Sequence, residues 1–399
     1  MTWRRQPPVL SPVPARALVY GIGAAIGFSS GSETVAATVR QRYGALDALL
    51  TDSGTSALIL ALRRILPRGG TVAYPAYACI DLTAAAVGAG VHVRLYDVDP
   101  ATLSPDLGSV RDVIRRGVDA IVVAHLYGYP ADVIGVRMLA DEQGVPVIED
   151  AAQGAGGTLH GALLGSLGDV AILSFARGKG TTGGSGGAVL AKTPPLADWT
   201  RSVRSDLQAS TRGGLLVLSL AAQRLLSHPA LYRLPGSIPG LKLGEMVYHP
   251  PRPPRAMAAV SAAVLRWTLG LEKREVLHRR AVARDLLSRM HETRNAVPVR
   301  PIAGGESGFL RLALLDAGGG MVPRPDLGAL RGYPMTLEEH PQLGSLLLSG
   351  ERAGKGSQVL RDRLFTVPTH SGVGQSDLVR LSEWLDGHQA ASHVIAAFS

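Results

Sequence analysis

Short apolar runs alternate with amphipathic stretches along the first half of the chain. The apolar runs have the length and composition of buried strands. They span 48–51, 71–77, 91–97, 120–126 and 145–150. Helical patterns at 55–66, 80–88 and 132–143 separate them. This alternation predicts a mostly parallel sheet with helices on both faces. Because ligands of such sheets bind at the carboxyl ends of the strands, the residues after each run are the first candidates for chemistry.

The second half of the chain has a less regular pattern. Two further strands, predicted at 171–176 and 187–191, flank a glycine-rich loop, and the proline-rich stretch at about 195–255 is predicted to be less regular. One long helix or two joined helices are expected over 256–290, followed by strands at 308–314 and 364–368. We therefore expect an extended N-terminal arm with a large domain over 1–255, and a small C-terminal α/β domain over 256–399.

The composition is that of a folded globular protein. The chain has 399 residues, of which 46% are apolar and 18% are charged. Its single cysteine, Cys79, excludes a disulfide within the chain and a cysteine-rich zinc site, and no metal site is expected. The scarcity of cysteine is compatible with a reducing compartment, so we expect a cytoplasmic protein.

The formal net charge of +9 raises the possibility of nucleic-acid binding. The positive charge is nearly all arginine, is spread along the whole chain, and forms no dense basic run interleaved with aromatic residues. We therefore expect no nucleic-acid partner. An arginine-rich proteome or a preference for anionic small substrates would also explain the charge.

An apolar run at 17–28 follows Arg4 and Arg5 and superficially resembles a signal peptide. Four prolines lie between the arginines and the run, and the run is too short to span a bilayer. We interpret it as a helix packed at a domain or subunit surface, and we expect no membrane contact.

Three motifs carry candidate chemistry, and the first is the segment 52–58, which follows a strand and opens a helix. Free N–H groups and the positive end of the helix dipole favour phosphate binding at such a position. Gly54 permits close approach, while Thr55 and Ser56 offer hydroxyl groups. An ordinary N-cap, which also prefers Ser and Thr, is the alternative interpretation.

The second motif ends the predicted strand at 145–150. A carboxylate at the end of a buried strand is costly unless a group pairs with it, and a protonated pyridine nitrogen would pair with Asp150. Gln153 is placed to hydrogen-bond a ring hydroxyl or to cover a ring face. Alternatively, Asp150 caps the next helix.

The third motif is the segment 174–180, which contains Ser174 and Lys179. Lysine is scarce in this chain, whereas arginine is used throughout. An imine-forming nucleophile must lose its proton, which arginine cannot do, so Lys179 is the candidate. We expect burial in a glycine-rich pocket to lower the pKa of Lys179. Ser174 would donate to a phosphate. A surface lysine on a flexible loop is the alternative.

Together, the three motifs are more specific than any of them alone. A phosphate cradle, a strand-end aspartate and then a lysine beyond one further strand is the order found in pyridoxal-phosphate (PLP) enzymes of fold type I. The sequence therefore predicts an aspartate-aminotransferase-like fold with PLP as cofactor.

The chain resembles the DegT/StrS-type aminotransferase family over roughly 30–195, as a divergent branch. The best-known members of this family aminate keto sugars bound to nucleotides. The motifs that carry the resemblance are Ser53–Leu58, Asp97–Pro100, His125–Gly128, Val147–Gln153, Gly165–Asp169, Ser174–Lys179 and Gly183–Gly187.

The resemblance implies a role for each site residue. Lys179 would hold the cofactor as a Schiff base and shuttle protons, and Asp150 would hold the pyridine nitrogen. Gln153 would contact the ring hydroxyl. Ser174 and the helix-start residues 54–56 would bind the phosphate. A lysine at position 179 resembles the aminotransferases of the family, since a branch that removes a sugar hydroxyl has histidine there.

Three features depart from the family pattern. The ring-face position, where an aromatic residue is usual, aligns with Cys79, and the nearest aromatic residue is Tyr77. The Asn-aromatic-Arg motif that reaches the neighbouring subunit has no clear counterpart near Tyr248. Gly180 stands where asparagine is common.

His125 has two interpretations: it either tunes the cofactor ring or is a hydrogen-bonded structural residue. Cys79 is interpreted as a small buried apolar residue rather than a nucleophile.

These motifs and the resemblance predict a PLP-dependent aminotransferase. It would move an amino group, expected from glutamate, to a keto sugar or sugar-like carbonyl, in saccharide or secondary-metabolite biosynthesis. The resemblance also implies a homodimer with shared active sites. Three alternatives stay open: another PLP reaction (elimination, racemisation or carbon–carbon bond formation), a non-catalytic PLP-fold protein, and an anion-binding or nucleic-acid role.

Overall fold

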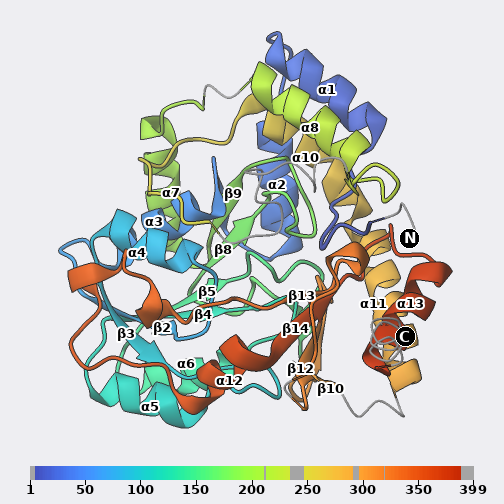
Figure 1. The fold of residues 1–399 in the computed structure, drawn as a ribbon. Helices are drawn as coiled ribbons and strands as arrows, with labels where there is room; N and C mark the ends of the chain where they lie inside the picture. Colours follow the sequence, from blue (N-terminus) through green and yellow to red (C-terminus); the bar gives the residue numbers. More distant parts are fainter. Residues whose placement is uncertain (1–4, 211–212, 234–246, 291–295, 319, 388–399) are drawn as a thin grey trace.

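A seven-stranded sheet forms the centre of the large domain (Figure 1). The computed structural model describes residues 5–210, 213–233, 247–290, 296–318 and 320–387. The strands are β1 (Asp47–Thr51), β2 (Thr71–Pro75), β3 (His92–Tyr96), β4 (Ala120–Ala124), β5 (Val147–Asp150), β8 (Val170–Ser174) and β9 (Gly187–Ala191). Their order is β1-β9-β8-β5-β4-β2-β3. Strand β9 runs antiparallel to both neighbours, and the other pairs are parallel.

Helices cover both faces of this sheet, because most of its strands are buried on both sides. The helices of the large domain are α2 (Ser32–Arg42), α3 (Gly54–Ile65), α4 (Asp81–Ala89), α5 (Leu107–Arg115), α6 (Val133–Asp141) and α7 (Pro194–Asp206). Helix α3 packs against β8 and β9, while α5 and α6 pack against each other and against β3 and β5. The carboxyl ends of β4, β5 and β8 therefore open beside the start of α3.

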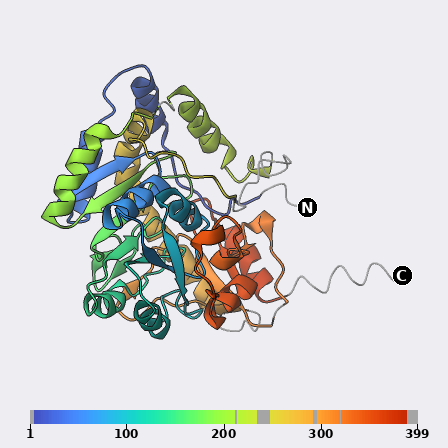
Figure 2. The same cartoon turned by 90° about the vertical axis from the view of Figure 1, so that its left-hand side faces the viewer.

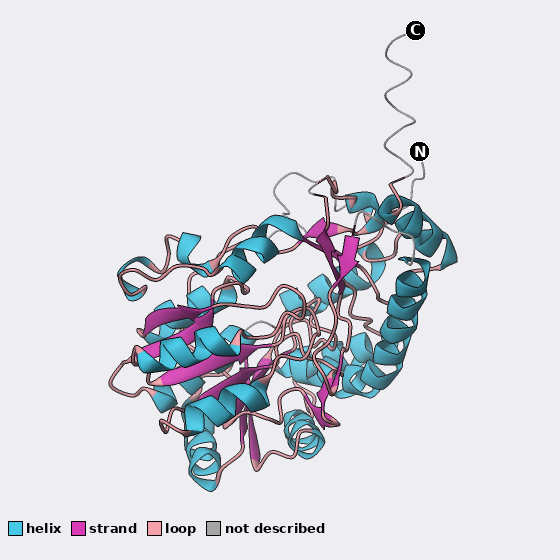
Figure 3. Ribbon diagram, turned by 90° about the horizontal axis from the view of Figure 1, so that it is seen from below, coloured by secondary structure: helices cyan, strands magenta, loops and turns pink. Residues whose placement is uncertain are grey.

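A four-stranded antiparallel sheet forms the small domain. Its strands are β10 (Ala296–Pro298), β12 (Leu312–Asp316), β13 (Leu330–Arg331) and β14 (Leu364–Val367), in the order β10-β12-β14-β13. Helices α11 (Glu272–Arg289), α12 (Lys355–Arg363) and α13 (Gln375–Leu385) accompany this sheet. Figure 3 shows the strands of the two large sheets as separate groups. Short strands β6 (Thr158–Leu159), β7 (Ala162–Leu163) and β11 (Gly305–Glu306) form a third sheet that joins the domains.

Three helices lie together beyond the central sheet: α1 (Ala15–Ala25), α8 (Gly214–Leu226) and α10 (Ala259–Thr268). Helix α1 packs against both α10 and α8 (Figure 1). Figure 2 shows α1 and α8 at the upper edge of the molecule. The run at 17–28 thus forms a helix at the surface, as predicted. No helix in the described part of the chain combines the length and apolar character needed to cross a membrane.

Most strand predictions agree with the structure to within two residues at each end. The region 256–290 forms two helices, α10 and α11, joined by a short 3-10 turn, Leu269–Leu271. The less regular stretch predicted over 195–255 contains most of α7 and all of α8, so it is more helical than its prolines indicated. The prolines misled the interpretation because they stand at the first turn of α7 and outside α8, where they do not interrupt a helix. The domain boundary after residue 255 stays a prediction, and α10, which follows it, packs against α1 and α2.

Candidate active site

One pocket brings the three sequence motifs together at the carboxyl ends of β4, β5 and β8. Its lining residues come from the start of α3, the start of α4, the three strand ends and the loop after β8. They are Ser53, Gly54, Thr55, Leu58, Cys79, Asp81, Leu82, Ala124, His125, Leu126, Asp150, Ala152, Gln153, Ser174, Ala176 and Lys179. Residues up to 126 positions apart in the chain therefore face one cavity, as the rule for open α/β sheets predicts.

The start of α3 forms one wall of this pocket. Ser53 is the N-cap, and its hydroxyl oxygen accepts a hydrogen bond from the Ser56 N–H at 3.0 Å. A Cβ atom on Gly54 would lie 2.8 Å from the Cβ of Ser174, so only glycine lets the helix start approach the end of β8 this closely. The N–H groups of the first helical turn and two nearby hydroxyls, on Thr55 and Ser174, suit a phosphate group.

Ser56 does not line the pocket. Its hydroxyl accepts from the Ser53 hydroxyl at 2.9 Å, and the residue is buried. The N-cap interpretation of this segment is therefore correct for the Ser53–Ser56 pair. The same helix start also lines the pocket, so the N-cap interpretation and the phosphate-binding interpretation do not exclude each other.

Lys179 lies in a loop held by backbone contacts on both sides. Gly178 and Gly180 adopt φ angles of 76° and 81°, which favour glycine. The carbonyl of Gly180 accepts from the buried guanidinium of Arg279 at 3.0 Å, and the Thr181 N–H donates to the Lys179 carbonyl at 3.0 Å. These contacts fix the loop, so the interpretation of Lys179 as a flexible surface lysine is wrong.

The expectation that burial lowers the pKa of Lys179 is also wrong in its net direction. Burial does act to lower the pKa, but three acidic neighbours, Cys79, Asp81 and Asp150, act to raise it, and the pKa of Lys179 is raised. The sequence did not predict that three acidic groups would lie around the amine. In this pocket, Lys179 carries a proton that neighbouring carboxylates stabilise.

Asp150 ends β5 and faces the pocket. Its Oδ1 accepts from the Ala152 N–H at 2.9 Å. No helix begins after it, so the interpretation of Asp150 as a helix cap is wrong. Burial raises the pKa of Asp150, although Ala152, Lys179 and His125 act in the opposite direction. Because a buried carboxylate is costly without a partner, Asp150 favours a positively charged group in the pocket.

Gln153 is held in place on both sides of its amide. Its Oε1 accepts from the Tyr127 N–H at 2.9 Å, and its Nε2 donates to the Tyr333 hydroxyl at 2.6 Å. The Tyr333 ring stacks on the Tyr127 ring, with centroids 5.1 Å apart. Tyr333, which follows β13, thus connects the small domain to the pocket wall.

Tyr77 does not take the ring-face position. It is fully buried, lies outside the pocket lining, and its hydroxyl accepts from the Tyr333 N–H at 2.7 Å. Cys79 lines the pocket instead, and its thiol donates to Asp81 Oδ2 at 3.5 Å. Burial and the Asp81 carboxylate raise the pKa of the Cys79 thiol to about 12. A thiol with this pKa is a poor nucleophile, which agrees with the interpretation of Cys79 as a non-nucleophilic residue, although its side chain is half-buried rather than buried.

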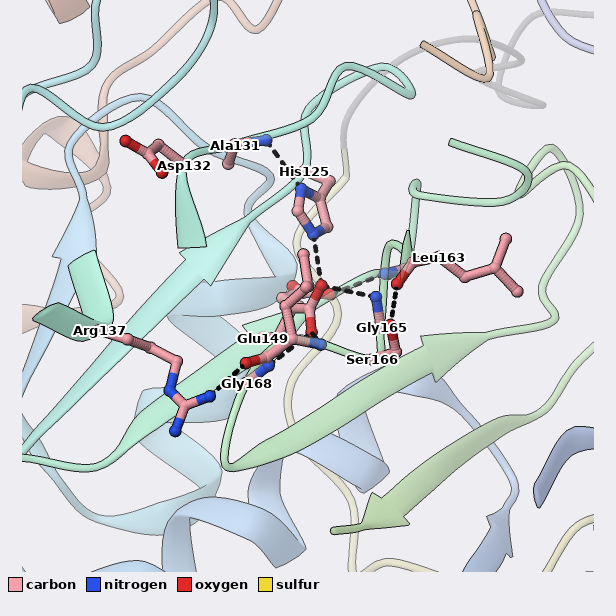
Figure 4. A network of polar contacts seen from close by, with 12 residues as sticks. His125, Ala131, Asp132, Arg137, Glu149, Leu163, Gly165, Ser166 and Gly168 are labelled. Atoms are coloured by element: carbon pink, nitrogen blue, oxygen red, sulfur yellow. Dashed lines mark hydrogen bonds and ion pairs between the residues drawn. The ribbon is translucent and has the colours of Figure 1, made fainter. Parts of the chain in front are cut away.

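His125 is bonded through both ring nitrogens (Figure 4). Its Nδ1 accepts from the Ala131 N–H at 3.0 Å, and its Nε2 lies 2.9 Å from Glu149 Oε1. The acceptor role of Nδ1 places the proton on Nε2, which donates to Glu149. The structural interpretation of His125 is therefore correct for its nitrogens, and the residue also lines the pocket.

Glu149 is fully buried directly behind Asp150 and accepts four hydrogen bonds. The donors are the His125 ring and the N–H groups of Gly165, Leu167 and Gly168. Burial acts to raise the pKa of this carboxyl, but the bonds from His125 and the backbone outweigh it and lower the pKa. A charged carboxylate in the core thus ties β5 to β4 and to the loop before β8.

The sequence analysis assigned no role to Glu149, Asp81, Tyr333 or Arg279. Asp81 could have been found by the rule that found Asp150, since it follows the end of parallel strand β2. No comparable signal marks Tyr333 or Arg279, which come from distant parts of the chain. Of the residues near the missing Asn-aromatic-Arg motif, Arg255 contacts Asp52, next to the α3 start: its carbonyl accepts from the Asp52 N–H, and its N–H donates to the Asp52 carboxylate.

Comparison with known proteins agrees with this geometry. The model of the DegT/DnrJ/EryC1/StrS aminotransferase family matches residues 29–213, which contain the α3 start, Asp150 and Lys179. The resemblance predicted from the sequence is confirmed.

Two curated aminotransferases illustrate the proteins to which this chain is similar in sequence. L-glutamine:2-deoxy-scyllo-inosose aminotransferase from Streptoalloteichus tenebrarius is 37% identical over 155 residues, which are 39% of this chain and 37% of that protein. UDP-N-acetyl-3-dehydro-alpha-D-glucosamine 3-aminotransferase from Acidithiobacillus ferrooxidans is 35% identical over 155 residues, which are 38% of this chain and 42% of that protein. The chain thus matches only about two fifths of the length of these relatives.

Solved structures extend the likeness in fold to nearly the whole chain. An aminotransferase from Streptoalloteichus hindustanus matches with a TM-score of 0.75 and 20% identity, over 99% of this chain and 100% of that one. The E. coli GDP-4-keto-6-deoxy-D-mannose-3-dehydratase with bound hydrated PLP matches with a TM-score of 0.75 and 15% identity, over 96% and 100%. The predicted fold class, aspartate-aminotransferase-like fold type I, is confirmed.

Proposed function

We propose that this protein is a PLP-dependent aminotransferase. It moves an amino group from an amino acid to the carbonyl of a keto sugar or a sugar-like acceptor. The observation that carries the proposal is the convergence of Lys179, Asp150 and the α3 start on one pocket. The family match over the same residues supports it.

The pocket residues fit each chemical group of PLP. The first turn of α3, with Thr55 and Ser174, suits a phosphate, and the glycine at position 54 allows the close approach that such a site needs. Asp150 offers a carboxylate to a pyridinium nitrogen, and Lys179 offers an amine to an aldehyde. When bound, PLP would supply an electron sink for a carbanion at the amino carbon of the donor.

The chain's own residues bind, orient and move protons. Asp150 would hold a pyridinium nitrogen in its charged form by ion pairing, since its carboxylate is buried in the pocket lining. Gln153, whose amide is fixed by Tyr127 and Tyr333, would orient the ring hydroxyl. Lys179 Nζ is the group that takes and returns the proton in each half-reaction, because it is the lysine of the pocket lining and both nitrogens of the other basic residue, His125, are engaged in hydrogen bonds.

The proposed acceptor class comes from the relatives. One acts on 2-deoxy-scyllo-inosose with glutamine as donor, and another carries a UDP-sugar in its name. For this chain we propose a cyclic polyhydroxy ketone, free or nucleotide-linked, in saccharide or secondary-metabolite biosynthesis. Glutamate is the expected donor, with glutamine as the second choice. We also propose a cytoplasmic homodimer with shared active sites, which sedimentation or light scattering of the purified protein can test.

The test is an absorbance spectrum of the PLP-loaded protein before and after addition of L-glutamate or L-glutamine. We compare the wild type, Lys179→Ala and the matched control Lys273→Ala, whose lysine is exposed on α11. The wild type and the control should show the band of lysine-bound PLP and lose it as keto acid forms in equal amount. Lys179→Ala should not show this band.

Other outcomes separate the alternatives. A wild-type band that no amino donor changes would overturn transamination from these donors and favour another PLP reaction. Failure to bind PLP would overturn the central proposal. An unchanged spectrum in Lys179→Ala would show that a different lysine carries the cofactor.

A further inference from the structure

The amide of Gln153 is held from two directions, and this decides which of its atoms is left for a ligand. Its Oε1 accepts from the Tyr127 N–H at 2.9 Å, and its Nε2 donates to the Tyr333 hydroxyl at 2.6 Å. Because a backbone N–H can only donate, the contact with Tyr127 identifies the oxygen end of the amide. The amide nitrogen carries two hydrogens, and one of them is directed at Tyr333. The second N–H is therefore the polar group that Gln153 offers to the pocket.

The backbone at Tyr127 supports this orientation. Tyr127 adopts a φ angle of 54°, in the left-handed region that residues with a side chain seldom adopt. The segment before β12 maintains this conformation: the Tyr127 carbonyl accepts from the Arg311 N–H at 3.2 Å. The carbonyl of the next residue, Gly128, accepts from the Gly308 N–H at 2.9 Å. A strained backbone that its neighbours maintain is common where one group has to point in a fixed direction.

Tyr333, the second anchor of the amide, is also fixed. It follows β13 and is buried, and its ring centroid lies 5.1 Å from that of Tyr127 and 5.3 Å from that of Tyr77. Its N–H donates to the Tyr77 hydroxyl at 2.7 Å. A Cβ atom on Gly332 would lie 2.2 Å from the same hydroxyl, so this contact requires glycine before Tyr333. The position of the Tyr333 hydroxyl is thus set by packing and not by Gln153 alone.

We propose that Tyr333 is a positioning residue, which fixes the Gln153 amide so that an N–H, and not the carbonyl, faces the ring oxygen of the cofactor. This inference rests on the proposed function, because it takes PLP as the ligand of the pocket. Tyr333 is not among the residues that line the pocket, so it acts through Gln153. The four-stranded sheet of the small domain then contributes to cofactor binding twice, through Tyr333 after β13 and through Arg311 before β12.

The orientation of the amide has a chemical consequence. A donor at the ring oxygen stabilises the form in which that oxygen carries more negative charge. Lysine-bound PLP shares a proton between its imine nitrogen and the ring oxygen, so a donor at the oxygen allows this proton to leave at lower pH. Loss of the Gln153 N–H should therefore raise the midpoint pH at which the absorbance of lysine-bound PLP changes.

The test is a pH titration of the absorbance of the full-length, PLP-loaded protein without an amino donor. We compare the wild type with Gln153→Ala, Tyr333→Phe and the matched control Tyr129→Phe. Phenylalanine keeps each aromatic ring and removes the hydroxyl. Tyr129 is fully buried, lies outside the pocket lining, and its hydroxyl accepts from the Ala313 N–H at 3.2 Å. Both tyrosine variants thus remove a buried hydroxyl that accepts a hydrogen bond.

The expected shifts follow from the number of anchors that remain. Gln153→Ala removes the donor, and the midpoint should rise by about one pH unit. Tyr333→Phe leaves the amide with its contact to Tyr127 alone, and the midpoint should rise by about half a pH unit. Tyr129→Phe should leave the midpoint unchanged. Urea unfolding of the two tyrosine variants should show a similar loss of stability in both, so stability alone does not explain the difference.

Each outcome decides the proposal. A rise in Gln153→Ala and in Tyr333→Phe, with no change in Tyr129→Phe, supports it. An unchanged midpoint in Tyr333→Phe, a fall in place of a rise, or an equal rise in Tyr129→Phe overturns it. Because no donor is added, the titration does not depend on amino transfer: a protein that binds PLP but transfers no amino group contradicts the proposed function alone. A wild type that forms no lysine-bound PLP overturns both.

Discussion

Replacing Glu149 by glutamine should test how the core supports the candidate site. The carboxylate accepts four hydrogen bonds, at 2.6 to 2.9 Å, from His125 Nε2 and from the N–H groups of Gly165, Leu167 and Gly168. Glutamine has nearly the same shape but only one acceptor oxygen. In either orientation of the amide, its NH2 group must face two of the donors.

The size of the effect follows from that geometry. Two buried donors would lose their acceptor, and each unsatisfied group costs roughly 1–3 kcal/mol. We therefore expect Glu149→Gln to lower the free energy of unfolding by about 2–6 kcal/mol. The lost hydrogen bonds lie at the end of β5, next to Asp150, so the affinity for PLP should fall as well.

The effect should also depend on pH. The pKa of Glu149 is lowered in the folded protein, so between the folded and unfolded pKa values the unfolded state binds more protons. The stability contributed by Glu149 is therefore present above pH of about 4.3, its unfolded pKa, and is lost as pH falls through the lower folded value. Glu149→Gln should lack this component.

The assay is urea unfolding of the wild type and Glu149→Gln at neutral and acidic pH. The control is Glu306→Gln, whose side chain is 67% exposed and pairs with Arg280 at 3.0 Å. This control should change stability by less than about 1 kcal/mol. A loss in Glu149→Gln as small as that of the control would refute the assignment of a buried, charged, fully bonded carboxylate.

Three further predictions concern single positions. Gly54→Ala should weaken PLP binding by at least about tenfold, because a Cβ atom would lie 2.8 Å from the Cβ of Ser174; titration with PLP measures this. Asp81→Asn should lower the pKa of Lys179, since it removes a neighbouring carboxylate, and the pH dependence of the PLP absorbance should shift to lower pH. Burial lowers the pKa of His370 to about 4. Below pH of about 6.5, the folded state therefore binds fewer protons than the unfolded state. Unfolding experiments should show a loss of up to roughly 3 kcal/mol in the free energy of unfolding as the pH falls to about 4.

Each has a control or a contradicting result. Gly270→Ala, where a Cβ atom meets no other atom within 4 Å, should leave PLP binding unchanged. An unaltered pH profile in Asp81→Asn would show that Asp81 does not act on the lysine. A His370→Gln variant that loses stability with the same slope below neutral pH would assign that slope to other groups.

The central sheet and the pocket were predictable because both depend on local patterns. Apolar runs of strand length marked the sheet, and Gly54, Asp150 and Lys179 each stand within a few residues of a strand end. The rule that strand ends share one edge then placed them together without knowledge of any contact. The wider surroundings of Lys179 were not predictable in this way, and its pKa direction was therefore wrong.

The elements that the sequence analysis missed depend on contacts between distant residues. Helix α8 was overlooked because a series of prolines follows it, although none interrupts it. Tyr333 lies 180 positions from Gln153, which it contacts, and Arg279 lies 99 positions from Gly180. Hydrophobic periodicity reports which face of an element is buried, but not which residue of another domain meets it.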